Sequence, residues 1–150
     1  MKILLIGNGG RENAIAWKIY NSKSFIENNG KIFNTIGNPG INKFAEPVNI
    51  NSTDINELIE FTLREKIDFT VVGPEIPLSL GIVDEFEKKG LRIFGPRKQA
   101  AEIESSKVFA KNLMLQNNIP TALHRVFSKE NLEEAKEFFK QCSYPVVIKA

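Results

Sequence analysis

The sequence predicts an α/β fold: an open sheet of parallel strands with helices between them. Short apolar runs, such as those at 3–6 and 68–72, have the near-continuous hydrophobicity of strands buried on both faces of a sheet. Segments with helical spacing of apolar residues alternate with these runs, which is typical of parallel sheets with right-handed crossovers. Loops rich in glycine and proline follow the runs, at the carboxyl ends of the strands, where open α/β sheets bind ligands.

The elements up to residue 96 follow each other as strand, helix, strand, helix, strand, helix, strand. Thr53-Asp54 is expected to cap the second helix, in which apolar residues recur at helical spacing. Gly90 is expected to end the third helix. We predict strands at 3–6, 31–36, 68–72 and 92–94, and helices at 11–20, 55–63 and 78–89.

The pattern changes after Pro96. Helices are predicted at 100–104, 107–117 and 131–142, and strands at 123–127 and 144–148. A strand as apolar as the last one needs sheet neighbours, so we expect residues from about 121 onward to begin a second domain that continues in a longer protein. The expected division is a domain at 1–100, a helical linker at 101–120 and the start of the second domain at 121–150.

Composition excludes several classes of protein. The chain has 150 residues and a net charge of +2, with no basic cluster, which argues against a nucleic-acid or membrane-surface partner. Cys142 is the single cysteine, so an internal disulfide is excluded and a reducing compartment is favoured. No apolar stretch reaches the ~18 residues of a membrane span. We therefore expect a cytoplasmic protein.

The loop GNGGRE at 7–12 connects the first strand directly to a helix. Glycines let the backbone approach a ligand, the unpaired amides of the helix favour an anion, and Arg11 adds a charge suited to phosphate. A tight turn without a ligand is the alternative. A nicotinamide dinucleotide fits poorly, because Glu12 occupies the position of the third glycine. The second strand also ends without the expected acidic residue, at Asn34, Thr35 and Asn38.

The loop Gly73-Pro74-Glu75 follows another buried strand. Pro74 and Pro77 stiffen it, so that the Glu75 carboxylate would be held at the same edge of the sheet. Such a carboxylate is suited to a hydroxyl or an amine of a small molecule. A solvated loop glutamate is an equally good interpretation of this loop alone.

Seven motifs together resemble the N-terminal part of the phosphoribosylamine–glycine ligases, or glycinamide ribonucleotide synthetases, of the ATP-grasp superfamily. The motifs are GNGGRE at 7–12, GN-x-G at 37–40, VVGPEIPL at 71–78, IFGP at 93–96, ESSK at 104–107, NIPTA at 118–122 and YPVVIKA at 144–150. The resemblance implies a Rossmann-like domain, then the start of an ATP-grasp domain. It also implies de novo purine synthesis, in which glycine is joined to 5-phosphoribosylamine through a glycyl phosphate while ATP is cleaved to ADP and phosphate.

The resemblance also assigns residues. Lys107 and Lys149 would contact ATP, whereas the family's Mg²⁺ ligands would lie outside this sequence, which therefore offers no metal site of its own. The family's usual histidine is replaced by Asn13, which cannot carry a proton charge near neutral pH. Catalytic residues stay unassigned. The residues expected to line the phosphoribosylamine site are Asn8, Gly9, Gly10, Arg11, Glu12, Gly73, Pro74 and Glu75.

We expect the 150-residue chain to be inactive alone and to need the remainder of an ATP-grasp chain. Two alternatives remain open at this point. The chain could belong to a related ATP-grasp enzyme, such as a carboxylase or a carboxyaminoimidazole ribonucleotide synthetase. It could also be a sugar-phosphate-binding module without catalysis.

Overall fold

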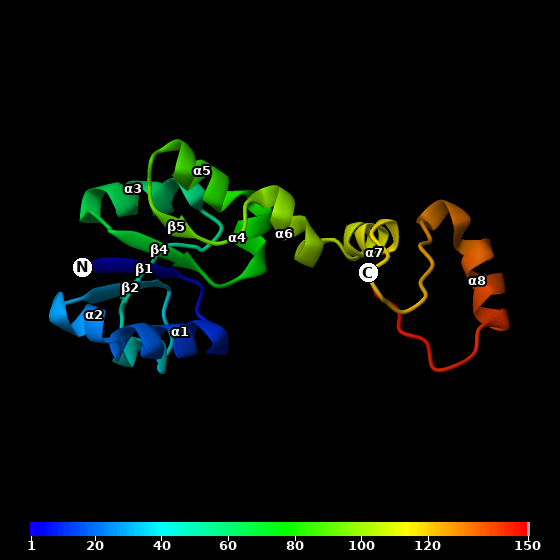
Figure 1. The fold of residues 1–150 in the computed structure, drawn as a ribbon, viewed down its shortest axis with the longest axis horizontal. Coiled ribbons are helices and arrows are strands. Elements are labelled where there is room, and N and C mark those ends of the chain that lie inside the picture. Colours follow the sequence, from blue (N-terminus) through cyan, green and yellow to red (C-terminus); the bar gives the residue numbers. More distant parts are fainter. Residues whose placement is uncertain (150) are drawn as a thin grey trace. The chain divides into compact units, whose positions relative to one another are not determined.

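A five-stranded parallel sheet forms the centre of the first of two compact units, residues 1–105 and 106–150, in the computed structural model (Figure 1). The structure describes residues 1–149. The strand order is β3-β2-β1-β4-β5. The strands are β1 (Lys2–Ile6), β2 (Lys31–Thr35), β3 (Glu46–Val48), β4 (Phe69–Val72) and β5 (Ile93–Phe94). The predicted α/β class is confirmed.

Helices cover both faces of this sheet. Figure 1 shows α1 and α2 on one face and α3 and α5 on the other. The predicted cap of α3 is confirmed, since the Asp54 side chain accepts a hydrogen bond from the Glu57 amide at 3.0 Å. The helical elements of this unit are α1 (Gly10–Tyr20), α2 (Lys23–Glu27), η1 (Ile41–Lys43), α3 (Ile55–Glu65), α4 (Glu75–Leu80), α5 (Ile82–Lys88) and α6 (Lys98–Ser105).

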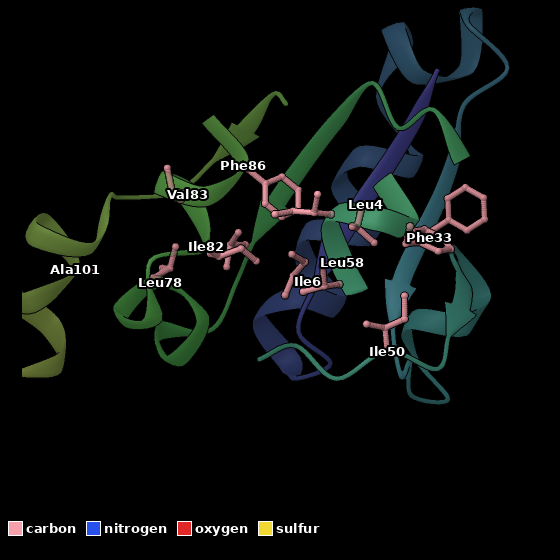
Figure 2. Packing of buried hydrophobic residues seen from close by; sticks show 13 residues of the cluster. Leu4, Ile6, Phe33, Ile50, Leu58, Leu78, Ile82, Val83, Phe86 and Ala101 are labelled. Atoms are coloured by element: carbon pink, nitrogen blue, oxygen red, sulfur yellow. The ribbon is translucent and has the colours of Figure 1, made fainter. Parts of the chain in front are cut away.

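The apolar run of β1 divides between two cores, because successive side chains of a strand point to opposite faces. Leu4 and Ile6 pack in the core with α3 and α5, where Phe86 is fully buried (Figure 2). Ile3 and Leu5 pack on the other face, against α1 and α2. Each such buried side chain contributes about 1.5–3 kcal/mol of transfer free energy. The sandwiched strand therefore fixes where its carboxyl end, and the loop after it, must lie.

The structure corrects three details of the first unit. The helix predicted at 78–89 is two helices, α4 and α5, separated by Gly81, whose φ of 94° is left-handed. The first of these helices also begins three residues earlier than predicted, so Glu75 is its first residue instead of lying in a loop. The structure also contains α2 and the edge strand β3, which the sequence patterns did not predict.

The second unit is helical in its described residues, with α7 (Lys107–Gln116), η2 (Lys129–Asn131) and α8 (Leu132–Gln141). The strands predicted at 123–127 and 144–148 are wrong, because neither segment pairs with a strand in the described part of the chain. Apolar sequence indicates burial, but a strand also needs hydrogen-bonded neighbours. Val147 and Ile148 are accordingly exposed.

Candidate functional site

The carboxyl ends of β1 and β4 mark the point where the strand order reverses. From β1 the chain continues to β2 on one side, and it later returns to β4 on the other side. In open α/β sheets this is the crevice that receives ligands. Ile6 pairs in register with Val72, and the Gly73 amide donates to the Ile6 carbonyl at 3.0 Å. The glycine loop after β1 and the loop after β4 therefore begin side by side, as the sequence predicted.

The end of β2 braces the glycine loop. The Asn34 side-chain amide donates to the carbonyls of Leu5 (2.8 Å) and Gly7 (2.6 Å), and both bonds are buried. The Thr35 hydroxyl accepts from the Gly7 amide at 2.8 Å, and the Asn38 side chain donates to the Asn8 carbonyl at 2.6 Å. These three residues lie at or just after the end of β2, where a dinucleotide-binding fold would carry an acidic residue. Their structural role was not predicted, although Asn34 and Thr35 are polar side chains in an otherwise apolar strand, which was the available signal.

The N-terminus of α1 carries the free donors of the site. The helix begins at Gly10 after the N-cap residue Gly9. Among the described residues, the amides of Gly10, Arg11 and Glu12 donate to no backbone or side-chain acceptor. Unpaired amides at the positive end of a helix dipole favour an anion. This arrangement supports the predicted anion-binding site, which we call the anion cradle: the amides of Gly10, Arg11 and Glu12 together with the Arg11 guanidinium.

Glu12 lies beneath the loop, not on its outer surface. Its side chain is only 3% exposed, and its Oε2 accepts a hydrogen bond from the Gly9 amide at 2.6 Å. The structure thus separates Glu12 from Asn8 and Arg11, which are exposed, although all were predicted to line one side of the substrate site.

Arg11 and Glu75 meet across the crevice. The guanidinium Nη2 donates to the Glu75 Oε2 at 3.1 Å, and the two side chains are 71% and 52% exposed. An exposed pair of this kind contributes about 0.2–1 kcal/mol, so a ligand with more charge can displace it. Pro74, the N-cap residue of α4, sets the start of that helix and thereby the position of Glu75.

A shallow cavity of about 410 Å³ lies beside the anion cradle, between α1 and η1. Asn13 lines it, and its side-chain Oδ1 is buried without a hydrogen-bond partner among the described residues. Gly40 lies against the Asn13 amide, since a Cβ on Gly40 would be 2.9 Å from the Asn13 Nδ2. Asn13, for which the sequence resemblance implies a histidine in the family, therefore borders the predicted site. The other lining residues are Gly10, Ala14, Trp17, Lys43 and Phe44.

Lys107 and Lys149 belong to the second unit. Lys107 is exposed on the first turn of α7, directly after Ser106, whose hydroxyl caps the helix by accepting from the Phe109 amide at 3.2 Å. Lys149 is exposed in an irregular segment. Among residues 1–149, no group of three or more histidine, cysteine or acidic residues is placed so that it could hold a metal ion. No described helix has the length and apolarity required to cross a membrane.

Two family models match the chain over its whole length. The description "Phosphoribosylglycinamide synthetase, N domain" applies to residues 1–104, and "Phosphoribosylglycinamide synthetase, ATP-grasp (A) domain" to residues 105–150. The phosphoribosylamine–glycine ligase of Clostridium acetobutylicum is 52% identical over 150 residues, which are all of this chain and 35% of that protein. The chain thus spans about a third of the length of the curated relatives it matches.

Solved structures agree with this assignment. The phosphoribosylamine–glycine ligase of Thermotoga maritima superposes with a TM-score of 0.62 at 27% identity, covering 95% of this chain and 31% of that one. The biotin carboxylase domain of Hydrogenobacter thermophilus 2-oxoglutarate carboxylase, in complex with ADP and magnesium, gives a TM-score of 0.67 over 96% of this chain and 33% of that chain. At 19% identity, this second likeness shows the fold alone.

The predicted resemblance is confirmed by the family models and by the identity to curated ligases, both of which extend over the glycine loop, the brace at the end of β2 and the loop after β4. The chain belongs to the phosphoribosylglycinamide synthetase family.

Proposed function

We propose that the first unit binds 5-phosphoribosylamine for an ATP-dependent ligase that joins it to glycine, giving glycinamide ribonucleotide, ADP and phosphate. The observation that carries the proposal is the anion cradle at the crevice, where free amides of α1 and the Arg11 guanidinium face the loop after β4. The names of the relatives support the reaction. The corresponding place in the cell is the cytoplasm, in de novo purine synthesis.

Different residues of this chain would bind the phosphate and the sugar of the substrate. The amides of Gly10 and Arg11, with the Arg11 guanidinium, suit the phosphate, because charge-assisted bonds to an anion are stronger than neutral ones. Glu75 suits the hydroxyls or the amine of the sugar. A phosphate on Arg11 would displace the exposed ion pair with Glu75, whose carboxylate lies across the crevice from that phosphate and beside the place of the sugar.

The second unit would begin the ATP-grasp domain, which would then start near residue 105, where the second family model begins, and would include most of the segment 101–120 that was predicted as a linker. Lys107 and Lys149 fit a phosphate-binding role, because both are exposed lysines and Lys107 lies at the positive end of α7. ATP with Mg²⁺ supplies the phosphoryl group that activates the carboxylate of glycine. We further propose that the 150-residue chain does not catalyse the reaction alone. This is supported by its length, which is about a third of that of the relatives it matches. Glycine-dependent release of ADP by the purified chain would contradict that proposal.

The experiment that tests the substrate site is a calorimetric titration of the 150-residue chain with ribose 5-phosphate. Arg11→Ala should weaken binding by about tenfold, the lower end of the range for a charge-assisted bond, because the guanidinium is largely exposed. Arg64→Ala, which removes an exposed arginine of α3, is the matched control and should leave the affinity unchanged. Absence of binding at about 10 mM, or equal weakening by both variants, would refute the site.

A further inference from the structure

We propose that Glu12 is a positioning residue that fixes the two ligand-binding loops to each other from below. The inference rests on the proposed function, because it concerns the same crevice. It differs from the sequence prediction, in which Glu12 touched the substrate. Its basis is the way three glycines from two loops converge on this one carboxyl group.

The space around the Glu12 side chain is the first observation. A Cβ on Gly9 would lie 2.8 Å from the Glu12 Oε2, and one on Gly7 would lie 2.9 Å from its Cγ. A Cβ on Gly73, in the loop after β4, would overlap the Glu12 Oε1. Real Cβ atoms essentially never make such contacts. The Glu12 side chain therefore fills space that glycine leaves free in both loops.

The polar contacts of the carboxyl group are the second observation. Oε2 accepts a hydrogen bond from the Gly9 amide, whereas Oε1 is buried and accepts no hydrogen bond among the described residues. Burying an oxygen without a hydrogen-bond donor opposes folding. Buried polar atoms normally have a partner, so an unpaired one needs a specific reason. Contact with Gly73 supplies one, because Oε1 holds the second loop at a fixed distance from the first.

The consequence for the crevice concerns which donors remain for a ligand. Since the Glu12 carboxylate accepts the hydrogen bond of the Gly9 amide, the amides left for an anion at the start of α1 are those of Gly10, Arg11 and Glu12. Packing against Gly73 also fixes the neighbouring Glu75 opposite Arg11. A ligand then meets donors that are already arranged, which removes the cost of ordering them.

A double-mutant cycle on thermal unfolding tests the contact itself. Gly73→Ala should lower the melting temperature by roughly 5–15 °C, the range expected for overpacking in a unit of this size. In the Glu12→Ala background the same change should cost less than about a third of that, because the overlapping atom is gone. Gly10→Ala is the matched control, since its added Cβ has nothing within 4 Å, and should shift the melting temperature by less than about 2 °C. If Gly73→Ala alone does not fold, the double variant Glu12→Ala/Gly73→Ala should still fold, because the overlapping Glu12 atoms are gone, and failure of both to fold would count against the contact. Equal shifts in both backgrounds would overturn the proposal.

Titration with ribose 5-phosphate tests the positioning role. Glu12→Ala should weaken binding about tenfold if the competent loop arrangement falls to a tenth of the population. Glu12→Gln keeps an acceptor for the Gly9 amide and should bind as well as, or better than, the unmodified chain. Equal affinity of all three proteins would overturn the role. If the unmodified chain binds no ribose 5-phosphate, the proposed function and the positioning role both fall, while the cycle separately decides whether the contact exists.

Discussion

Replacing Asn34 with alanine removes the brace between β2 and the glycine loop. The side chain is fully buried, and its amide group donates to the carbonyls of Leu5 and Gly7. No water can take over these bonds without entering the sheet. The change therefore tests whether the glycine loop is held in place by the strand beside it.

The expected loss of stability can be worked out from the two hydrogen bonds. A buried acceptor that loses its donor costs about 1–3 kcal/mol, so two carbonyls give about 2–6 kcal/mol, with a central value of roughly 4. The bonds are buried, so solvent does not reduce this figure. With a urea m-value of about 2 kcal/mol/M, the unfolding midpoint of Asn34→Ala should fall by about 2 M.

Urea unfolding followed by circular dichroism measures the shift, and hydrogen exchange of the Gly7 amide reports the local effect. Asn21→Ala is the matched control, because its side-chain amide also donates to a backbone carbonyl, that of Trp17, at 2.7 Å but at an exposed position. Its midpoint should change by less than about 0.3 M. A shift below about 0.5 M for Asn34→Ala, with unchanged exchange at Gly7, would refute the brace.

Three further changes test other parts of the first unit. Asp54→Ala removes the cap of α3 and should cost about 1 kcal/mol in urea unfolding, whereas an unchanged midpoint would show that the cap is dispensable. Phe86→Ala empties a fully buried position and should cost about 3–5 kcal/mol; a loss below about 1 kcal/mol would mean that the core collapses around the gap. Hydrogen bonding to Glu85, together with its charge, raises the pKa of Lys88, so Glu85→Gln should lower that pKa toward its ordinary value in an NMR titration. A lysine whose pKa is raised by folding stabilises the folded state at pH values below its ordinary pKa, and this contribution is lost as the pH rises through the pKa of the folded state. The difference in unfolding free energy between the unmodified chain and Glu85→Gln should therefore vanish at strongly alkaline pH.

The central elements of the fold follow from the sequence because local pattern and tertiary environment agree there. The apolar strand β1 is buried on both faces, β4 is buried on one face and half-buried on the other, and α3 has a clear apolar stripe after its Asp54 cap. The edge strand β3 could not be predicted in this way. It has only three residues, Glu46–Val48, of which two are exposed, so its pairing with β2 decides its conformation.

The sequence predicted which residues gather at the site, but it did not predict which of them are buried. Glycine spacing and the positions of Arg11 and Glu75 indicated one shared edge, and the ion pair between them bears this out. The burial of Glu12 depends on Gly73, a residue 61 positions later, so no local pattern reveals it. The two wrong strands of the second unit have the same origin, since their hydrogen-bonding partners are not encoded in the segments themselves.

The two outermost strands of the sheet have a consequence for how molecules of this protein meet each other. One edge is the three-residue β3 with Pro47 at its middle, which lacks an N–H, and the other is the two-residue β5. A foreign strand that approached either edge would find few backbone groups with which to pair. Concentrated solutions of the first unit should therefore resist edge-to-edge aggregation, which would otherwise threaten an open sheet.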